Sequence, residues 1–147
     1  MKQLPISLYT DGGYSQKVNR GGYAAISQEL KFIVCGNSTN STNNQMELMA
    51  AIRGLELLEP NSNVIVYSDS RYVVDAISKY WLRNWEKNNW KTKDGNPVKN
   101  KEYWLRLKEA ISRHKKVKFE WVKGHSGNTY NEAVDELATV MKNYKGN

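Results

Sequence analysis

Ile6-Ser7-Leu8-Tyr9-Thr10-Asp11-Gly12-Gly13 is the stretch from which the fold can be read. Its apolar and polar residues alternate with the period of two that a pleated strand imposes. The two glycines allow a sharp turn, so we expect the strand to end there. Asp11 then stands at the end of a sheet strand, where an uncompensated charge is costly. Because Asp often accepts hydrogen bonds in turns, Asp11 alone indicates no function.

Two further strands follow the first. Residues 21–28 and 32–38 each predict a strand after the polar loop 14–20, and residues 30–31 lie near the turn between them. Strands this close in sequence are typical of an antiparallel meander.

A helix is expected at residues 45–58, after a loop rich in Asn, Ser and Thr and before Pro60. Glu47 shares a face of this helix with small residues, which let a helix approach a sheet closely. Its side chain is therefore predicted to point inward, and the alternative is a surface carboxylate that interacts with the helix dipole. The main apolar stripe consists of Leu48, Ala51, Ile52, Leu55 and Leu58.

Residues 64–67 are apolar and mostly β-branched, which is typical of a parallel strand covered on both faces. A right-handed crossover through the preceding helix would set this strand parallel to an earlier one. Asp69 follows its carboxyl end, where ligands of open α/β sheets bind. The competing interpretation is that Asp69 caps the next helix, which we expect to run from Arg71 to about Asn88.

The remainder predicts two helices and one strand around two loops. Asp135 lies one turn inside the last helix, beside its apolar stripe. With the earlier elements, this order indicates an α/β protein. The helices are expected at 101–114 and 130–144, the strand at 118–122, and the loops at 89–97 and 123–128.

Composition fits one soluble domain that spans residues 1–147. Hydrophobic residues make up 39% of the chain and charged residues 25%, and no apolar run approaches the length of a membrane span. The N-terminal residues lead directly into the first strand, so we expect no signal peptide. Cys35 is the only cysteine, which favours a reducing compartment and a cytoplasmic location; we expect it to be a small core residue.

The net charge of +7 is unevenly placed. The interval from Lys79 to Lys123 holds 14 Lys and Arg but 5 Asp and Glu, together with all five tryptophans. A basic surface interleaved with aromatic side chains suits nucleic acid. The alternative is a solvated helix face plus core tryptophans.

Asp11, Glu47, Asp69 and Asp135 each lie at an end of an apolar element and can point inward. Four carboxylates converge only if something offsets their charge. Oxygen ligands favour Mg²⁺ or Mn²⁺, and carboxylates that hold two such ions are the arrangement for hydrolysis of a phosphodiester. The site and the basic surface thus independently indicate nucleic acid.

The chain resembles type 1 ribonuclease H over about residues 6–141. The matching pieces occur in order, and together they are specific although none is specific alone. They are Tyr9-Thr10-Asp11-Gly12-Gly13, Thr42-Asn43-Asn44-Gln45-Met46-Glu47-Leu48, Tyr67-Ser68-Asp69-Ser70, Asn89-Trp90-Lys91-Thr92, Gly124-His125-Ser126-Gly127-Asn128 and Asp135-Glu136-Leu137-Ala138.

The resemblance implies a mixed five-stranded sheet, three antiparallel strands and then two parallel ones, with helices on both faces. It implies hydrolysis of the RNA strand of RNA–DNA hybrids, which leaves 5′-phosphate and 3′-hydroxyl ends. Asp11, Glu47, Asp69 and Asp135 would hold two Mg²⁺ ions, for which Mn²⁺ can substitute. Glu47 would also read a ribose 2′-hydroxyl, and His125 would assist turnover.

The resemblance also implies how a hybrid duplex is held. Residues 80–101 resemble the basic protrusion of the family, and we expect Trp90, Lys91, Lys93 and Lys99 to contact substrate there. Trp81 and Trp85 match the DNA-strand channel, Thr42 and Asn100 a DNA-phosphate pocket, Asn43 and Asn44 the minor-groove contacts, and Arg71 a position beside the RNA strand.

Three departures from the family pattern are expected to bear on affinity and sequence preference rather than on chemistry: Asn40 where an arginine is frequent, Lys17 and Arg20 in the first loop, and Arg71 itself. Rival functions are a 3′–5′ exonuclease, which would carry a second acidic residue where Gly13 stands, a transposase or integrase, and a hybrid-binding module without activity. We expect a monomer that binds no membrane.

Overall fold

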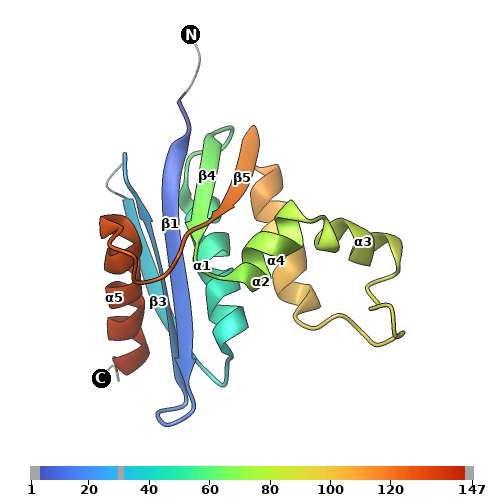
Figure 1. Ribbon diagram of the computed structural model, residues 1–147, viewed down its shortest axis with the longest axis horizontal. Helices are drawn as coiled ribbons and strands as arrows, with labels where there is room; N and C mark the ends of the chain where they lie inside the picture. The colour runs from blue at the N-terminus through green and yellow to red at the C-terminus, as the bar shows by residue number, and fades with distance from the viewer. Residues whose placement is uncertain (1–3, 30–31, 145–147) are drawn as a thin grey trace.

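Five strands form one mixed sheet in the order β3-β2-β1-β4-β5 (Figure 1). The computed structural model describes residues 4–29 and 32–144, so the expected approach of residues 1–3 to the first strand and the expected turn at residues 30–31 lie outside the described residues. The first three strands are antiparallel, and β4 and β5 run parallel to β1. The predicted mixed sheet is therefore confirmed. The strands are β1 (Ile6–Ser15), β2 (Arg20–Ser27), β3 (Phe32–Thr39), β4 (Asn63–Ser68) and β5 (Lys116–Trp121).

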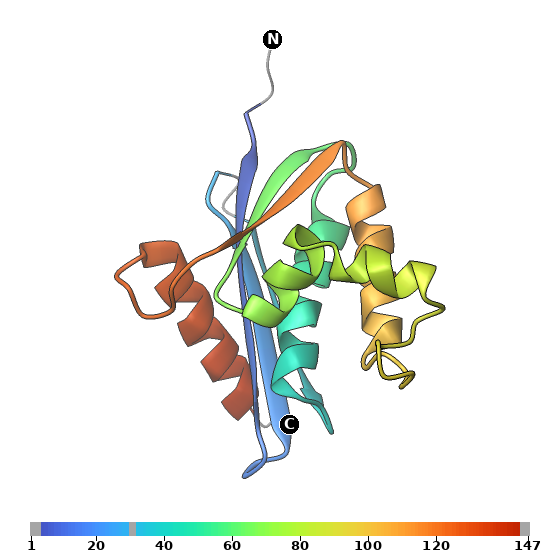
Figure 2. The same cartoon turned by 45° about the vertical axis from the view of Figure 1, so that its right-hand side comes forward.

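Helices cover both faces of this sheet, as expected. The helix α5 (Thr129–Asn143) packs on one face, over β1, β2 and β3. The helices α1 (Asn43–Leu57), α2 (Arg71–Ser78) and α4 (Lys101–Ser112) lie on the other face, and α3 (Trp81–Lys87) projects away from the sheet (Figures 1 and 2). Within the described part of the chain, none of these helices has both the length and the apolar character that a membrane span requires.

The expectation that the first strand ends at Gly12-Gly13 is wrong. The strand β1 continues to Ser15, and Gly12 and Gly13 pair with Tyr23 and Gly22 of β2. Gly12 is needed because the backbone of α1 approaches β1 closely at this point, not because the chain turns. A Cβ atom at Gly12 would lie 2.3 Å from the backbone carbonyl of Met46 in α1. This glycine lets the first turn of α1 sit directly on the middle of β1.

The expected single helix over residues 71–88 is also wrong. The helix α2 ends at Ser78 and α3 begins at Trp81. Between them, Tyr80 adopts a left-handed backbone conformation with φ of 62°, which breaks the helical hydrogen-bond pattern. Local apolar spacing continues across the break, so the sequence pattern did not reveal it. The break sets α3 at the base of the protrusion.

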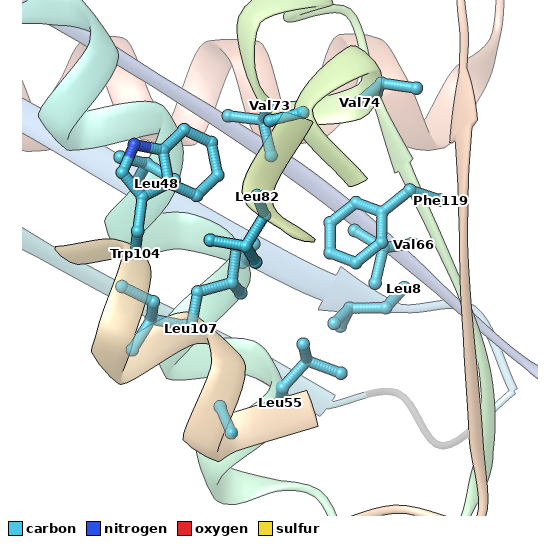
Figure 3. Close-up of a cluster of buried hydrophobic side chains, with 14 of the residues drawn as sticks. Leu8, Leu48, Leu55, Val66, Val73, Val74, Leu82, Trp104, Leu107 and Phe119 are labelled. Carbon is cyan, nitrogen blue, oxygen red and sulfur yellow. The ribbon is translucent and has the colours of Figure 1, made fainter. Parts of the chain in front are cut away.

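The larger core lies between the sheet and helices α1, α2 and α4 (Figure 3). Every residue of the predicted apolar stripe of α1 is buried. Trp104 of α4 is fully buried, and its indole N–H donates to the Tyr72 hydroxyl at 3.2 Å. A smaller cluster under α5 consists of Tyr9, Ala24, Val134 and Ala138. These clusters fix α1 and α5 against the sheet.

Cys35 is exposed, so its expected place in the core is wrong. It lies on β3, which is an edge strand of the sheet. Alternate residues of this strand face away from the core, and the nearby Ile33 is 60% exposed. An apolar run on an edge strand therefore does not imply that both of its faces are covered.

Candidate active site

Three carboxylates meet at the centre of the sheet. Oxygen atoms of Asp11, Glu47 and Asp69 all lie within 4.8 Å of one another. Asp11 comes from the middle of β1, Glu47 from the first part of α1 and Asp69 from the segment after β4. Asp135 of α5 lines the same cavity, whose volume is about 210 Å³. The fold thus gathers all four carboxylates that the sequence analysis singled out.

The helices α1 and α2 are capped by Thr42 and Ser70, not by the carboxylates of the cavity. The Thr42 side chain caps α1 by accepting from the Gln45 N–H at 3.1 Å. Ser70, not Asp69, caps α2, and its hydroxyl accepts from the Val73 N–H at 3.3 Å. The interpretation of Asp69 as a helix cap is therefore wrong, and its carboxylate is available for a ligand.

The Asp69 carboxylate packs closely against the loop that follows β5. A Cβ atom at Gly124 would lie 2.8 Å from Oδ2 of Asp69. The neighbouring His125 has a left-handed backbone conformation and is 80% exposed on its side chain. Its Nδ1 atom lies 3.8 Å from Oδ2 of Asp135. His125 therefore stands at the exposed side of the cavity, next to the Asp135 carboxylate, whose side chain is 41% exposed.

Burial and mutual repulsion disfavour charge in this cluster. Burial, and then the charge of Asp69, raise the pKa of Asp11 from its ordinary value of 3.8 to about 8. Burial, and then the charges of Asp11 and Asp69, raise the pKa of Glu47 well above its ordinary value. Like charges in a desolvated site disfavour ionisation unless a cation offsets them.

A divalent cation fits this donor set. Among the described residues, Oε1 of Glu47 is a buried side-chain oxygen without a hydrogen-bond partner. An unpaired buried acceptor is costly, and a bound cation would satisfy it. All the clustered donors are carboxylate oxygens, which suit hard cations such as Mg²⁺ and Mn²⁺.

This electrostatic arrangement predicts an unusual pH dependence for the metal-free protein. The folded-state pKa of Asp11 lies above its unfolded value, so the folded state retains a proton that the unfolded state loses between about pH 4 and pH 8. The free energy of unfolding should therefore fall as pH rises through this window. Asp11→Asn should flatten the fall and stabilise the protein at pH 8 by on the order of 1–3 kcal/mol.

Urea unfolding from pH 5 to pH 8 with a chelator measures this effect. Glu136→Gln is the matched control, because Glu136 is an exposed carboxylate on α5 that does not line the cavity. If the free energy of unfolding depended on pH in the same way in the parent and in Asp11→Asn, burial and repulsion would not raise the pKa of Asp11.

A polar network joins the start of α1 to the start of α4. The Gln45 side-chain amide donates to Oδ1 of Asn100 at 3.1 Å, and the Asn100 amide donates to the Tyr72 hydroxyl at 3.1 Å. Gln45 thus links the segment of Thr42 to Asn100. The sequence analysis missed Gln45 and Tyr72 as parts of this region, although Gln45 stands inside one of the matching pieces.

The neighbouring loop residues have structural partners of their own. Oδ1 of Asn43 accepts from the Tyr14 N–H at 2.6 Å, whereas Asn44 is exposed. Asn40 exchanges hydrogen bonds with the side chain of Asn19. The Arg20 guanidinium donates to the backbone carbonyl of Lys142 near the end of α5 at 3.3 Å. Asn40 and Arg20, which depart from the family pattern, are therefore held by contacts within the fold.

The protrusion carries a groove of about 430 Å³ between α3 and the segment after it. The groove is lined by four residues that the sequence analysis expects to contact substrate: Trp81, Trp85, Lys91 and Lys93. Lys99 is exposed but does not line it.

Two other predicted residues lie apart from that groove. Trp90 is half-buried, and Nζ of Lys101 lies 5.8 Å from its ring centroid. Arg71 is on α2, at the carboxyl end of β4, with its guanidinium carbon 3.8 Å from the ring centroid of Trp121. Trp81 and Trp121 are 37% and 39% exposed and Trp104 is fully buried, so the five tryptophans divide between core and surface.

Thr139 and Lys142 also line the carboxylate cavity, and the sequence analysis did not single them out. They follow Asp135 by four and seven residues, which places them on the same face of α5. Their spacing from Asp135 was the signal in the sequence that could have identified them as residues of the cavity.

Comparison with known proteins gives one consistent result. Residues 3–142 match the family RNase H. A protein named Ribonuclease H from Rhizobium etli is 48% identical over 135 residues, which cover 90% of this chain and 88% of the relative. Another from Caldicellulosiruptor saccharolyticus is 46% identical over 143 residues, covering 96% and 97%.

A solved structure agrees with these relatives. The crystal structure of LC9-RNase H1, described as a type 1 RNase H with the type 2 active-site motif, superposes with a TM-score of 0.78 at 25% identity. The match covers 97% of this chain and 74% of that protein.

Proposed function

Since the chain belongs to the ribonuclease H family, we propose that it hydrolyses the RNA strand of RNA–DNA hybrids with two metal ions, leaving 5′-phosphate and 3′-hydroxyl ends. Family membership makes the chain a nuclease of the hydrolase class. The observation that carries the two-ion proposal is the cluster of Asp11, Glu47 and Asp69, in which a buried oxygen of Glu47 lacks a partner.

Asp11, Glu47, Asp69 and Asp135 would hold the two Mg²⁺ ions, for which Mn²⁺ can substitute. When bound, such ions lower the pKa of an attacking water and stabilise the charge on a leaving oxygen. Rigid elements carry the clustered donors, since Asp11 is inside a central strand and Glu47 is in the first part of a packed helix. The side chain of Asp135 is 41% exposed, so it would be the part of the cluster that faces an approaching substrate.

His125 would move a proton at the open side of the cavity. Its exposure and its place beside Asp135 suit a group that exchanges protons with solvent and with a departing product. Glu47, beside the ribose in this proposal, would also accept from the 2′-hydroxyl that distinguishes RNA from DNA.

The remaining predicted residues would hold the duplex. The groove lined by Trp81, Trp85, Lys91 and Lys93 would receive the DNA strand. Trp90 and Lys99, in the same segment of the chain, would also contact substrate. Thr42 and Asn100, linked through Gln45, would bind a DNA phosphate, and Asn43 and Asn44 would contact the minor groove. Arg71 would contact the RNA strand.

In this proposal residues 1–147 act as a single catalytic domain with a basic protrusion at about residues 80–101. A monomer suffices, because one chain supplies all four carboxylates and the groove. The one cysteine, which has no disulfide partner within the chain, suits action in a reducing cytoplasm.

Digestion of a hybrid labelled on its RNA strand tests the proposal. We expect cleavage with Mg²⁺, none with a chelator, and none of double-stranded DNA, with product ends that a 5′-phosphate-dependent exonuclease accepts. A binding module without activity also explains the basic groove, and it predicts retention of intact hybrid under all these conditions. Intact RNA in the presence of Mg²⁺ or Mn²⁺ would reject the enzymatic proposal.

Ca²⁺ should support hybrid binding but not hydrolysis. It accepts irregular coordination and longer bonds than Mg²⁺, so it can offset the carboxylate charge without enforcing the geometry of in-line attack. We expect cleavage at least about 100-fold slower than in Mg²⁺, and comparable hybrid affinity in fluorescence anisotropy. Similar turnover in Ca²⁺ alone would argue against this account of the site.

A further inference from the structure

The side chain of Trp121 makes two contacts with the short segment that carries Asp69. Its indole Nε1–H donates to the backbone carbonyl of Asp69 at 3.1 Å. The face of its ring lies 3.8 Å from the guanidinium carbon of Arg71. Asp69 and Arg71 are two residues apart, on either side of the cap of α2. One aromatic side chain therefore holds both ends of the short segment that carries a cluster carboxylate.

The Asp69 carbonyl lies just beyond the sheet. The register of β4 and β5 ends with Ser68 opposite Trp121, and the Val122 N–H donates to the Ser68 carbonyl at 2.9 Å. The indole N–H extends this pattern by one residue with a side-chain donor. Because the carboxylate of Asp69 already packs against Gly124, a fixed peptide at Asp69 also fixes the direction of its carboxylate.

Arg71 is held but not neutralised. Within residues 4–29 and 32–144 no carboxylate lies within ion-pair distance of its guanidinium, and the residue is exposed. Stacking on an aromatic face leaves the N–H groups at the edge of the guanidinium available, and these groups match phosphate oxygens. Its charge is therefore exposed to solvent, two residues from Asp69 in the chain, and is not used in an ion pair.

We propose that Trp121 is a positioning residue that sets two components of the site at once: the metal-ligating carboxylate of Asp69, through the indole N–H, and the phosphate-contacting guanidinium of Arg71, through the ring face. This inference rests on the proposed function, because it uses a metal at the carboxylates and a strand of nucleic acid beside Arg71. It adds that the two contacts are separable, since one needs only the N–H and the other only the ring.

Three variants separate these contacts. Trp121→Phe keeps an aromatic face and removes the donor, Arg71→Ala keeps the donor and removes the cation, and Trp121→Ala removes both. Two readouts need no catalysis: Mn²⁺ affinity of the protein without nucleic acid, by electron paramagnetic resonance, and affinity for a hybrid in chelator, by fluorescence anisotropy. Near-ultraviolet circular dichroism confirms that each variant is folded.

Trp121→Phe should weaken Mn²⁺ binding by about three- to tenfold, the value of one hydrogen bond, and leave hybrid affinity within about twofold. Arg71→Ala should show the reverse, and Trp121→Ala should show both losses. Arg71→Lys should restore only part of the hybrid affinity, because an ammonium does not stack as a guanidinium does.

Parent-like Mn²⁺ affinity in folded Trp121→Phe would overturn the inference, and so would parent-like hybrid affinity in Trp121→Ala. Cleavage by the parent protein is measured separately. A parent that binds Mn²⁺ but does not cut hybrids would defeat the proposed function, while the pattern of the variants would still decide the role of Trp121.

Discussion

Asp69→Asn is expected to reduce the rate of hybrid cleavage by at least about three orders of magnitude. The reason is that a bound metal ion lowers the free energy of the charged transition state by several kcal/mol. Hybrid affinity should stay within about twofold of the parent. Asp69 lies with Asp11 and Glu47 in the cluster, whereas the groove at Trp81 and Trp85 belongs to another part of the molecule. Substitution by Asn keeps the shape of the side chain and removes its charge.

Single-turnover cleavage and anisotropy with the same labelled hybrid measure the two quantities. Asp75→Asn is the matched control, because Asp75 is on the adjacent helix α2, pairs with Lys79 and does not line the cavity. It should cut like the parent. A folded Asp69→Asn variant that cleaved at near the parent rate would show that the carboxylate cluster is not the catalytic site.

Replacement of Lys91, Lys93 and Lys99 by Ala should raise KM far more than it lowers kcat. Lys91 and Lys93 line the groove of the protrusion and Lys99 follows it in the chain, and none of them lines the carboxylate cavity. Interactions made equally in the ground state and the transition state change KM and leave the chemical step alone.

The salt dependence of binding distinguishes direct phosphate binding from a general effect of charge. Removal of one lysine that binds a phosphate should flatten the log–log salt dependence by about 0.9 for a B-form duplex, so by about 2–3 units if all three lysines bind phosphates. The matched control is replacement of Lys115, Lys116 and Lys118 by Ala, which removes the same charge at or just before the edge strand β5. If the variant without Lys91, Lys93 and Lys99 kept the parent KM and the parent salt dependence of binding, the protrusion would not be the part that binds the hybrid.

Local periodicity was enough to predict much of the fold. The strand that begins at Ile6 and the 3.6-residue stripe of α1 were confirmed. The alternation in β1 does not mark one buried face, because residues 8–11 are all buried in a strand that helices cover on both sides. The same reasoning failed for the break at Tyr80, where a single left-handed residue interrupts a helix without a change in apolar spacing. It also failed for Cys35, because an apolar pattern does not tell an edge strand from a central one.

The sequence alone shows which carboxylates stand at the ends of apolar elements. It also shows that one segment is basic and rich in tryptophan. Both features can be read within one helix, strand or loop, without knowing how the elements pack. The folded chain was needed to show that Asp11, Glu47 and Asp69 share one site, that a glycine in β1 makes room for α1, and that Trp121 holds the Asp69 carbonyl. These interactions join residues between 22 and 58 positions apart, so they depend on how helices dock on the sheet, and the spacing within one element carries no information about that docking.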